Sequence, residues 1–497
     1  MRFGALTAAR AALVAGPTVL AFFAGGYFDE PRAWAGAVAW LLVAVALLAG
    51  ERPLPRWRGE WLAIAGLAAF AGWTLLSTTW APIAGSAYHA GQIVVLYLGG
   101  LLAAAMLLRP LGWQRAVEPA LAAGALAVIG YGISERVLPG VLHFARSHSA
   151  YGRLEQPLTY WNAMGELAAL GFVLCARLGG DATRSRGHRT LAAAASVVLG
   201  LGLYLSFSRG ALFACFAGLV VLAAIAPSRE QLQSIAVSLG GSALVSLAAS
   251  SFRGVTALAG DQSARERDGA IVLVLVAVVV SLTAGLQWYL ARSAQSSPVR
   301  LPRATPVVAV ALISAGLAVA ILAGAKERSS GPLTTGANRL VTLQSNRYDY
   351  WRVAMRAFRD EPVRGVGAGG WAVYWLRYRT INEFAQDAHS LPLQTLAELG
   401  IVGLALLSAF VAGIGVAARR AHKFAPALAA GPIAGFVVWL AHSPLDWDWQ
   451  MPAVTLIAIG LAGTLLAIGE TPRLRLPEAG GALSDDTVRP SLESPPR

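Results

Sequence analysis

The sequence predicts an all-α membrane protein that crosses the bilayer many times. Of its 497 residues, 56% are hydrophobic and only 13% are charged, and the apolar residues come in long blocks. A helix needs about 20 apolar residues to cross a bilayer, and only helices or closed barrels satisfy their backbone hydrogen bonds there. Strands of a membrane barrel would alternate polar and apolar residues, which these blocks do not. We therefore expect a polytopic helical protein.

The apolar blocks indicate about fourteen transmembrane helices, with twelve as the lower bound. The weakest block, 231–250, contains several serines and glycines, and its loss would reverse the orientation of everything on one side of it. The fourteen spans are centred near residues 18, 42, 70, 98, 124, 169, 199, 218, 241, 280, 314, 404, 432 and 460.

Arginine and lysine indicate the orientation. With the N-terminus inside, the inner segments carry 22 basic residues and the short outer loops carry 8. Ten more lie in the segment 325–390, which is left out because long loops are translocated largely regardless of charge. Both termini are therefore expected on the cytoplasmic side of the cytoplasmic (inner) membrane. This bias also explains much of the net charge of +13 without nucleic-acid binding.

Few segments remain outside the spans. Arg10 and the apolar residues after it have the general form of a signal peptide, but we expect a membrane anchor. Cys175 and Cys215 both fall in apolar blocks, which favours small core residues over a disulfide or a zinc site. We expect helices 1–11 over 1–324, an outer loop over 325–390, helices 12–14 over 391–469 and a proline-rich, disordered cytoplasmic tail over 470–497.

The outer loop begins with a predicted amphipathic helix over 347–359. Trp351, Ala354 and Phe358 share one stripe of this helix, and three arginines share another. Arg347 lies at the start of the apolar stripe, where an unpaired charge is costly, so we expect it to face an anion or a carboxylate. The spacing alone is also typical of a helix that lies on the bilayer surface. The three arginines are Arg352, Arg356 and Arg359.

A glycine-rich segment, 365–370, follows this helix. It lacks the lysine of a phosphate-binding P-loop and follows no strand, so we expect a flexible turn before a second short helix over 371–379. The aromatic residues of that helix fit either an interfacial belt or stacking on sugar rings. They are Trp371, Tyr374, Trp375 and Tyr378.

Two ionisable residues flank the start of the next span. His389 is expected on the outer face just above the membrane, and histidine can take a proton near neutral pH. A lone histidine at an interface is often incidental. Glu398 falls inside the span, where a carboxylate is costly and marks either a functional site or a contact with a neighbouring helix.

Further polar groups fall on the same expected outer side. Arg209 lies in a turn too short for solvent exposure, and Arg153 and Asn162 lie at the entry of the sixth span. Asp446 and Asp448 lie in the last outer turn, between tryptophans. Asn162 and the two aspartates did not enter the charge count that set the orientation, so their common side with the two arginines favours a single site.

These segments resemble a known family. The pattern R-x-x-x-W, A-x-x-x-F, P-x-x-G-x-G-x-G, followed by H-x-x-x-L-x-x-x-x-E-x-G-x-x-G, is similar to the O-antigen ligase/polymerase family of bacterial membrane glycosyltransferases. The S-R-G turn at Arg209 is similar as well. The resemblance covers roughly residues 60 to 465. Ser390 departs from it, because the family often has asparagine after the histidine.

The resemblance implies a GT-C-like architecture and a metal-independent, inverting glycosyl transfer on the outer face of the membrane. The donor would be a glycan on a polyprenyl diphosphate such as undecaprenyl diphosphate, and the acceptor a hydroxyl of a lipid-linked or cell-envelope glycan, or of a protein. His389 would be the general base, while Arg347 and Arg209 would bind the diphosphate, so no cofactor is expected. The expected substrate-binding residues are Arg153, Asn162, Arg352, Glu398 and Asp446.

Other functions stay open on the sequence alone. A polysaccharide polymerase of the same family would use the same groups with a growing lipid-linked chain as acceptor. A flippase or transporter of lipid-linked glycans would need charged residues in both halves of the membrane, whereas the polar candidates here gather on one side. A glycosyltransferase of the peptidoglycan-polymerising type and a non-catalytic glycan binder are further alternatives.

Overall fold

Helices of membrane-spanning length dominate the structure. The computed structural model describes residues 2–50, 58–292, 297–300 and 346–470, with scattered positions from 302 to 318. No β-strand occurs in these parts of the chain. The helices are α1 (Arg2–Ala21), α2 (Asp29–Ala49), α3 (Arg58–Leu76), α4 (Ala84–Leu107), α5 (Leu111–Val137), α6 (Trp161–Gly180), α7 (Arg186–Leu205), α8 (Arg209–Ile225), α9 (Arg229–Ser250), α10 (Arg253–Thr256), α11 (Gln262–Leu290), α13 (Arg347–Asp360), α14 (Gly370–Tyr378), α15 (Leu391–Phe424), α16 (Pro426–His442) and α17 (Pro452–Glu470).

The predicted spans agree with these helices. Thirteen of the fourteen predicted centres fall inside a described helix, and the span expected near residue 314 lies mostly outside the described residues. Eleven described helices are long and apolar enough to cross a membrane, and α8 and α16 are shorter, with 17 residues each. The doubtful block 231–250 forms α9 and is one of the eleven. The chain is a multi-pass membrane protein.

The first span differs from the prediction in its position. It was expected around residue 18, but α1 already ends at Ala21. Gly25 and Gly26 follow with φ of +67° and +76°, values that glycine adopts without steric cost. The chain therefore reverses in a tight turn before α2, although the two phenylalanines before the turn continue the apolar block.

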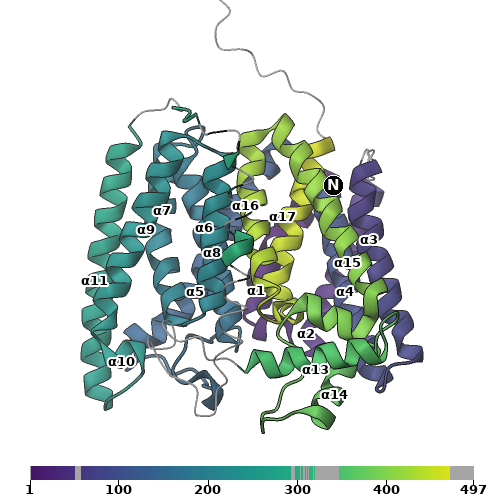
Figure 1. Ribbon diagram of the computed structural model, residues 1–497. Helices are drawn as coiled ribbons and strands as arrows, with labels where there is room; N and C mark the ends of the chain where they lie inside the picture. The colour runs from purple at the N-terminus through teal and green to yellow at the C-terminus, as the bar shows by residue number, and fades with distance from the viewer. Residues whose placement is uncertain are drawn as a thin grey trace, which may run out of the picture.

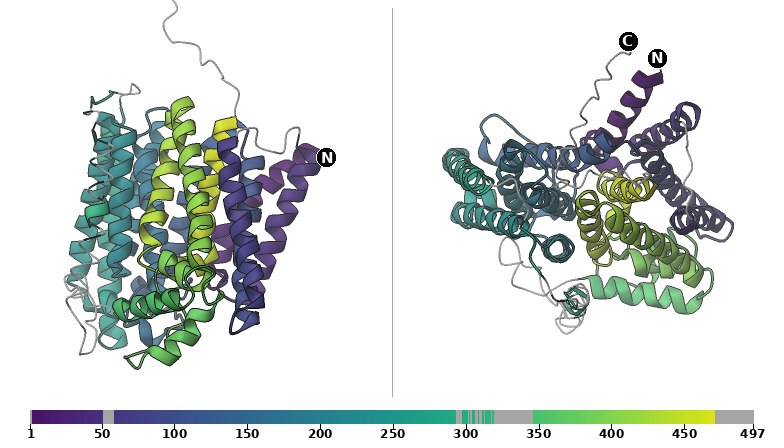
Figure 2. Two further views of the ribbon diagram at one scale, coloured as in Figure 1. Left: turned by 45° about the vertical axis from the view of Figure 1, so that its right-hand side comes forward. Right: turned by 90° about the horizontal axis from the view of Figure 1, so that it is seen from above.

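The long helices stand side by side (Figure 1). α6 is buried along its whole length and packs against α5, α7, α8, α9 and α16. α3, α4, α15 and α17 form a second group around their own apolar core. α1 and α2 lie at the edge of the bundle (Figure 2).

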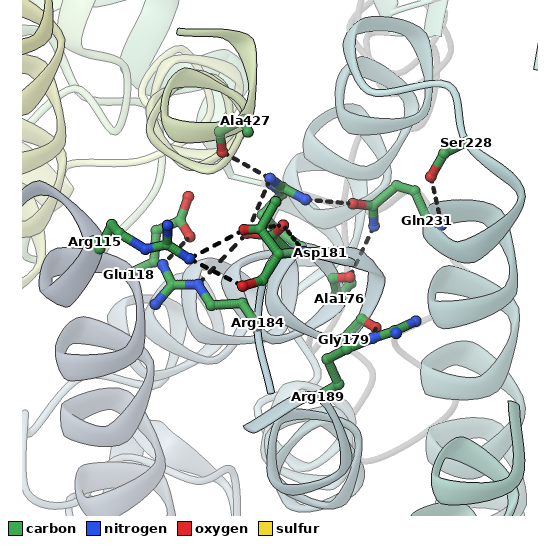
Figure 3. A network of polar contacts seen from close by, with 12 residues as sticks. Arg115, Glu118, Ala176, Gly179, Asp181, Arg184, Arg189, Ser228, Gln231 and Ala427 are labelled. Atoms are coloured by element: carbon green, nitrogen blue, oxygen red, sulfur yellow. Dashed lines mark hydrogen bonds and ion pairs between the residues drawn. The ribbon is translucent and has the colours of Figure 1, made fainter. Parts of the chain in front are cut away.

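Polar contacts fasten the end of α6 that lies away from α13 (Figure 3). Arg177 donates to the carbonyl oxygen of Ala427 over 2.7 Å and lies 3.3 Å from Asp181. Arg184 pairs with Asp181 and with Glu118, at 3.5 and 3.4 Å. These contacts join the ends of α5, α6 and α16, so arginines that the sequence placed on the inner side hold this end of the bundle together.

At the opposite end, α13 and α14 lie across the bundle rather than along it (Figure 1). The segment has its own small apolar core, in which the rings of Trp371 and Trp375 stack at 5.5 Å. Both tryptophans are fully buried, so neither forms an interfacial belt or a sugar platform. The buried face of α13 is also shifted from the predicted stripe, because Tyr350 and Val353 are buried while Trp351 is only half-buried.

α15 is interrupted near its start, and the glycine-rich segment docks into the interruption. Gly400 has φ of +65° and ψ of −165°, which breaks the helix. The amide groups of Val366 and Gly367 donate to the carbonyl oxygens of Ala397 and Glu398, over 3.0 and 2.8 Å. A side chain at Gly365 would place its Cβ 2.2 Å from the backbone carbon of Glu398. The predicted turn is present, and it is tightly packed rather than free.

We expect Gly400→Ala to lower the apparent melting temperature of the detergent-solubilised protein. The positive φ costs about 1–3 kcal/mol in strain for a residue with a Cβ. That Cβ would also lie 2.2 Å from the carbonyl oxygen of Val363. Thermal unfolding followed by tryptophan fluorescence measures the effect.

Gly415→Ala on the same helix is the matched control. No atom lies within 4 Å of the Cβ position at Gly415, so alanine should stabilise the helix by about 0.5–1 kcal/mol. Equal melting temperatures for the two variants would show that the break at Gly400 does not require glycine.

Candidate functional site

Four segments that are distant in the sequence meet beside α13. They are the start of α13, the residues before α15, the start of α6 and the turn between α16 and α17. A salt bridge from Arg347 Nη2 to Asp446 Oδ2, 2.5 Å long, joins the first to the last. The sequence predicted all four segments on one side of the membrane, and in the structure they meet there.

Asp446 is the centre of this cluster. Its side chain is fully buried and accepts hydrogen bonds from Tyr160 Oη over 2.6 Å and from the amide of Trp447 over 2.9 Å. Asn162 Nδ2 in turn donates to Tyr160 Oη over 2.7 Å. Three of the predicted residues, Arg347, Asn162 and Asp446, therefore belong to one hydrogen-bonded network.

The Arg347–Asp446 pair remains ionised despite its burial. Burial alone would raise the pKa of Asp446, but the Arg347 guanidinium holds this pKa below its ordinary value. Burial would likewise lower the pKa of Arg347, and Asp446 raises it instead. The Arg347 side chain is 22% exposed while Asp446 is not exposed at all, so the arginine presents the accessible charge.

His389 is held by its backbone and by two aromatic rings. It has φ of +52°, in the left-handed region that costs energy for a residue with a Cβ. Its ring lies 5.0 Å from Tyr350 and 6.2 Å from Trp447. Nδ1 is 2.9 Å from the carbonyl oxygen of Asp387. A carbonyl only accepts, so we assign the proton to Nδ1, and Nε2 then keeps the lone pair that a general base needs.

Arg209 begins α8 from a buried turn. Ser206, Phe207 and Ser208 are at most 3% exposed, as the short turn predicted, and Ser208 caps the helix by accepting the amide of Ala211. Arg209 itself is half-buried and is close enough to Tyr348 to lower its pKa, although burial raises that pKa overall. Tyr348 is next to Arg347 in the sequence, so Arg209 at the start of α8 lies near the start of α13.

This arrangement is suited to a reaction at an anion. A histidine with a basic nitrogen and a fixed guanidinium border the same turn, through Trp447 and Asp446 respectively, and guanidinium groups match the geometry of phosphate oxygens. Residues 264–408 match the family model described as O-antigen ligase. Over these residues the chain is O-antigen ligase-like. No curated protein matches it.

The segment that matches the O-antigen ligase family model contains part of the candidate site. Arg347, Arg352, His389 and Glu398 fall inside the match, while Arg153, Asn162, Arg209 and Asp446 fall outside it. The match therefore supports the family for the segment from α11 to α15, and the hydrogen-bonded network around Arg347 joins Asp446 and Asn162 to that segment. Proteins of this family are glycosyltransferase-like ligases and polymerases.

Two of the predicted residues lie away from Asp446. Arg153 donates to the carbonyl oxygens of Ala150 and Ser149, both over 2.7 Å, and stacks on Trp161 with 3.6 Å to the ring centre. Arg352 is exposed and binds Asp349 over 2.8 Å. The structure thus brings neither guanidinium into the network, although Arg153 approaches it through Trp161.

Glu398 has a clear structural contact. It is buried in α15, and its Oε1 accepts the amide of Trp371, at the start of α14, over 3.3 Å. A carboxylate at a helix N-terminus accepts a hydrogen bond from an amide that has no partner within the helix. Its negative charge also interacts favourably with the positive end of the helix dipole. Glu398 therefore fixes α14 to α15, which agrees with the predicted contact to a neighbouring helix.

The sequence reasoning missed two buried ionisable residues. Glu166 in α6 and His442 at the end of α16 are both fully buried, and His442 Nδ1 contacts the carboxylate of Asp448. The available signal was an ionisable residue within an apolar block, the same signal that identified Glu398.

Replacement of Glu398 separates its structural role from a chemical one. We expect Glu398→Gln to keep most of the folding stability, because the amide oxygen still accepts from Trp371. Glu398→Ala leaves that buried amide unpaired and should cost about 1–3 kcal/mol. Thermal unfolding and limited proteolysis of the α13–α14 region measure the difference. Similar losses for both variants would mean that the negative charge is required.

Proposed function

We propose that the protein transfers a glycan from a polyprenyl diphosphate to an acceptor hydroxyl on the outer face of the cytoplasmic membrane. The observation that carries this proposal is that His389 and Arg347, from two different segments, both lie against the turn that contains Asp446 and Trp447. The family match supports glycosyl transfer as the reaction class.

In the proposed reaction, the acceptor oxygen attacks the anomeric carbon of the donor sugar. His389 Nε2 takes the acceptor proton as the new C–O bond forms. The bond from the anomeric carbon to the diphosphate oxygen breaks, and polyprenyl diphosphate leaves with the bonding electron pair. A single displacement from the opposite face inverts the anomeric configuration.

The arginines would stabilise the leaving group. Charge grows on the diphosphate as its bond to the sugar breaks, and fixed donors that face this charge lower the barrier. Asp446 holds Arg347 in place for this task, and Arg209 would approach from α8. Guanidinium groups can neutralise a diphosphate directly, so we propose that no metal ion contacts it.

An apolar cavity of about 470 Å³ supports a lipid carrier. It lies between α1, α2 and the bundle, and Phe23 and Trp34, which help to line it, are more than half exposed. The cavity therefore opens to the surroundings of the bundle. Tyr27 lies four residues after Phe23, and the centre of its ring is 5.5 Å from that of Trp447. A diphosphate at Arg347 could thus continue into this cavity as an isoprenoid chain.

The first test compares wild type, His389→Ala and Arg347→Ala for release of free polyprenyl diphosphate. The purified protein in nanodiscs receives a polyprenyl-diphosphate oligosaccharide and mixed acceptors, with EDTA present. We expect a loss of about 10²–10⁴-fold for His389→Ala. Arg347→Ala should lose about 10²–10³-fold.

Arg359→Ala is the control on the same helix. Arg359 is exposed in the last turn of α13, so its variant should keep the wild-type rate. A wild-type rate in His389→Ala would remove histidine as the base. Donor binding without release in any variant would favour a flippase, whereas elongation of the donor glycan would identify a polymerase that uses the same groups.

A larger residue at Gly460 tests the lipid cavity. Gly460 lines the cavity, and no atom lies within 4 Å of its Cβ position. We expect Gly460→Phe to raise the KM several-fold for a donor with a long isoprenoid chain and to leave a short-chain donor unaffected. Gly36→Phe is the control, because Gly36 has similar open space outside the cavity. Equal effects on both donors would contradict binding of the chain there.

A further inference from the structure

Three buried ionisable side chains converge behind the turn that contains Asp446. Glu166 comes from α6, His442 from the end of α16, and Asp448 from the short helix Asp448–Gln450. Each side chain is at most 1% exposed, and one ligand atom of each lies within 4.8 Å of the others. His442 Nδ1 contacts Asp448 Oδ2 and lies 3.4 Å from Glu166 Oε2.

Some carboxylate oxygens of this cluster have no hydrogen-bond partner. In the described part of the chain, Glu166 Oε1 and Asp448 Oδ1 are buried without a hydrogen-bond partner. A buried carboxylate oxygen without a partner carries a desolvation penalty. Two ionised carboxylates carry more negative charge than one imidazole can balance even when it is protonated, and Arg347, which borders the same turn, is already paired with Asp446.

We propose that Glu166, His442 and Asp448 bind a divalent first-row metal cation of the zinc or manganese class. One divalent cation balances two carboxylates and a neutral imidazole, so the site becomes neutral where charge is most costly. The ligand set combines one nitrogen and two carboxylate oxygens, which suits zinc or manganese better than a calcium site made of oxygens alone.

Such an ion would position the active site without touching the substrate. It would join α6, α16 and the turn between α16 and α17, two residues from Asp446. Because its ligands are buried, the ion would be shielded from the diphosphate and from EDTA added to the folded protein. The inference does not depend on the proposed glycosyl transfer, since metal binding is measured without substrate.

The test is the metal content of the full-length protein, purified without chelators from cells supplied with Zn²⁺ and Mn²⁺. Inductively coupled plasma mass spectrometry should find about one equivalent per chain. His442→Ala, Glu166→Gln and Asp448→Asn should each retain at least tenfold less metal. Glu118→Gln is the matched control, because this buried carboxylate pairs with Arg184 at the opposite end of the bundle and should leave the metal content unchanged.

A second measurement covers variants that fail to fold. Wild type from metal-limited cells should gain thermal stability when Mn²⁺ or Zn²⁺ is added, and the bound Mn²⁺ should show nitrogen coupling from an imidazole in pulsed electron paramagnetic resonance. Less than a tenth of an equivalent of metal, with no thermal shift from either ion, would overturn the proposal. The cluster would then be a protonated His442 held between two carboxylates.

Discussion

A buried ion pair between Arg347 and Asp446 holds the surface helix α13 onto the end of the bundle, and the other polar groups at this end are arranged around it. Charges removed from water are costly unless they are paired and hydrogen-bonded. Asp446 meets this condition through Tyr160 and the amide of Trp447. The pair therefore fixes the start of α13 relative to α6 and to the turn before α17, and Tyr350, one turn along α13, stacks beside His389.

The break in α15 provides the second attachment of the same region. A continuous helix of 34 residues would be about 50 Å long, well beyond the hydrocarbon thickness of a bilayer. The break at Gly400 leaves carbonyl groups that the helix does not use, and the amides of the glycine-rich segment bind two of them. Arg347 and His389 are thus each fixed at one end of a segment that folds on its own apolar core.

The sequence predicted the spans well because membrane helices are identified by composition over a long window, which averages out local exceptions. It also predicted that Arg347 needs an anionic partner, since a charge on an apolar stripe must be paired. The identity of that partner could not be read, because Asp446 lies 99 residues away and no local pattern links the two.

The roles of other residues depended on contacts that no spacing reveals. Trp371 and Trp375 were expected in an interfacial belt or in stacking on sugar rings, yet they form the core of the α13–α14 segment. Glu166 and His442 each lie alone in an apolar block, and only the packing of α6 against α16 brings them together. Pairing between distant helices is a tertiary property, so single-sequence patterns identify the groups but not their partners.

The docking of the glycine-rich segment into α15 has a consequence for variation. Main-chain atoms make these hydrogen bonds, so the attachment demands small residues at a few positions and little else from the side chains. The outward-facing side chains of α13 and α14 can then change without moving Arg347 or His389. Under the proposed function, one scaffold would in this way serve glycans of different size and charge, with recognition separated from chemistry.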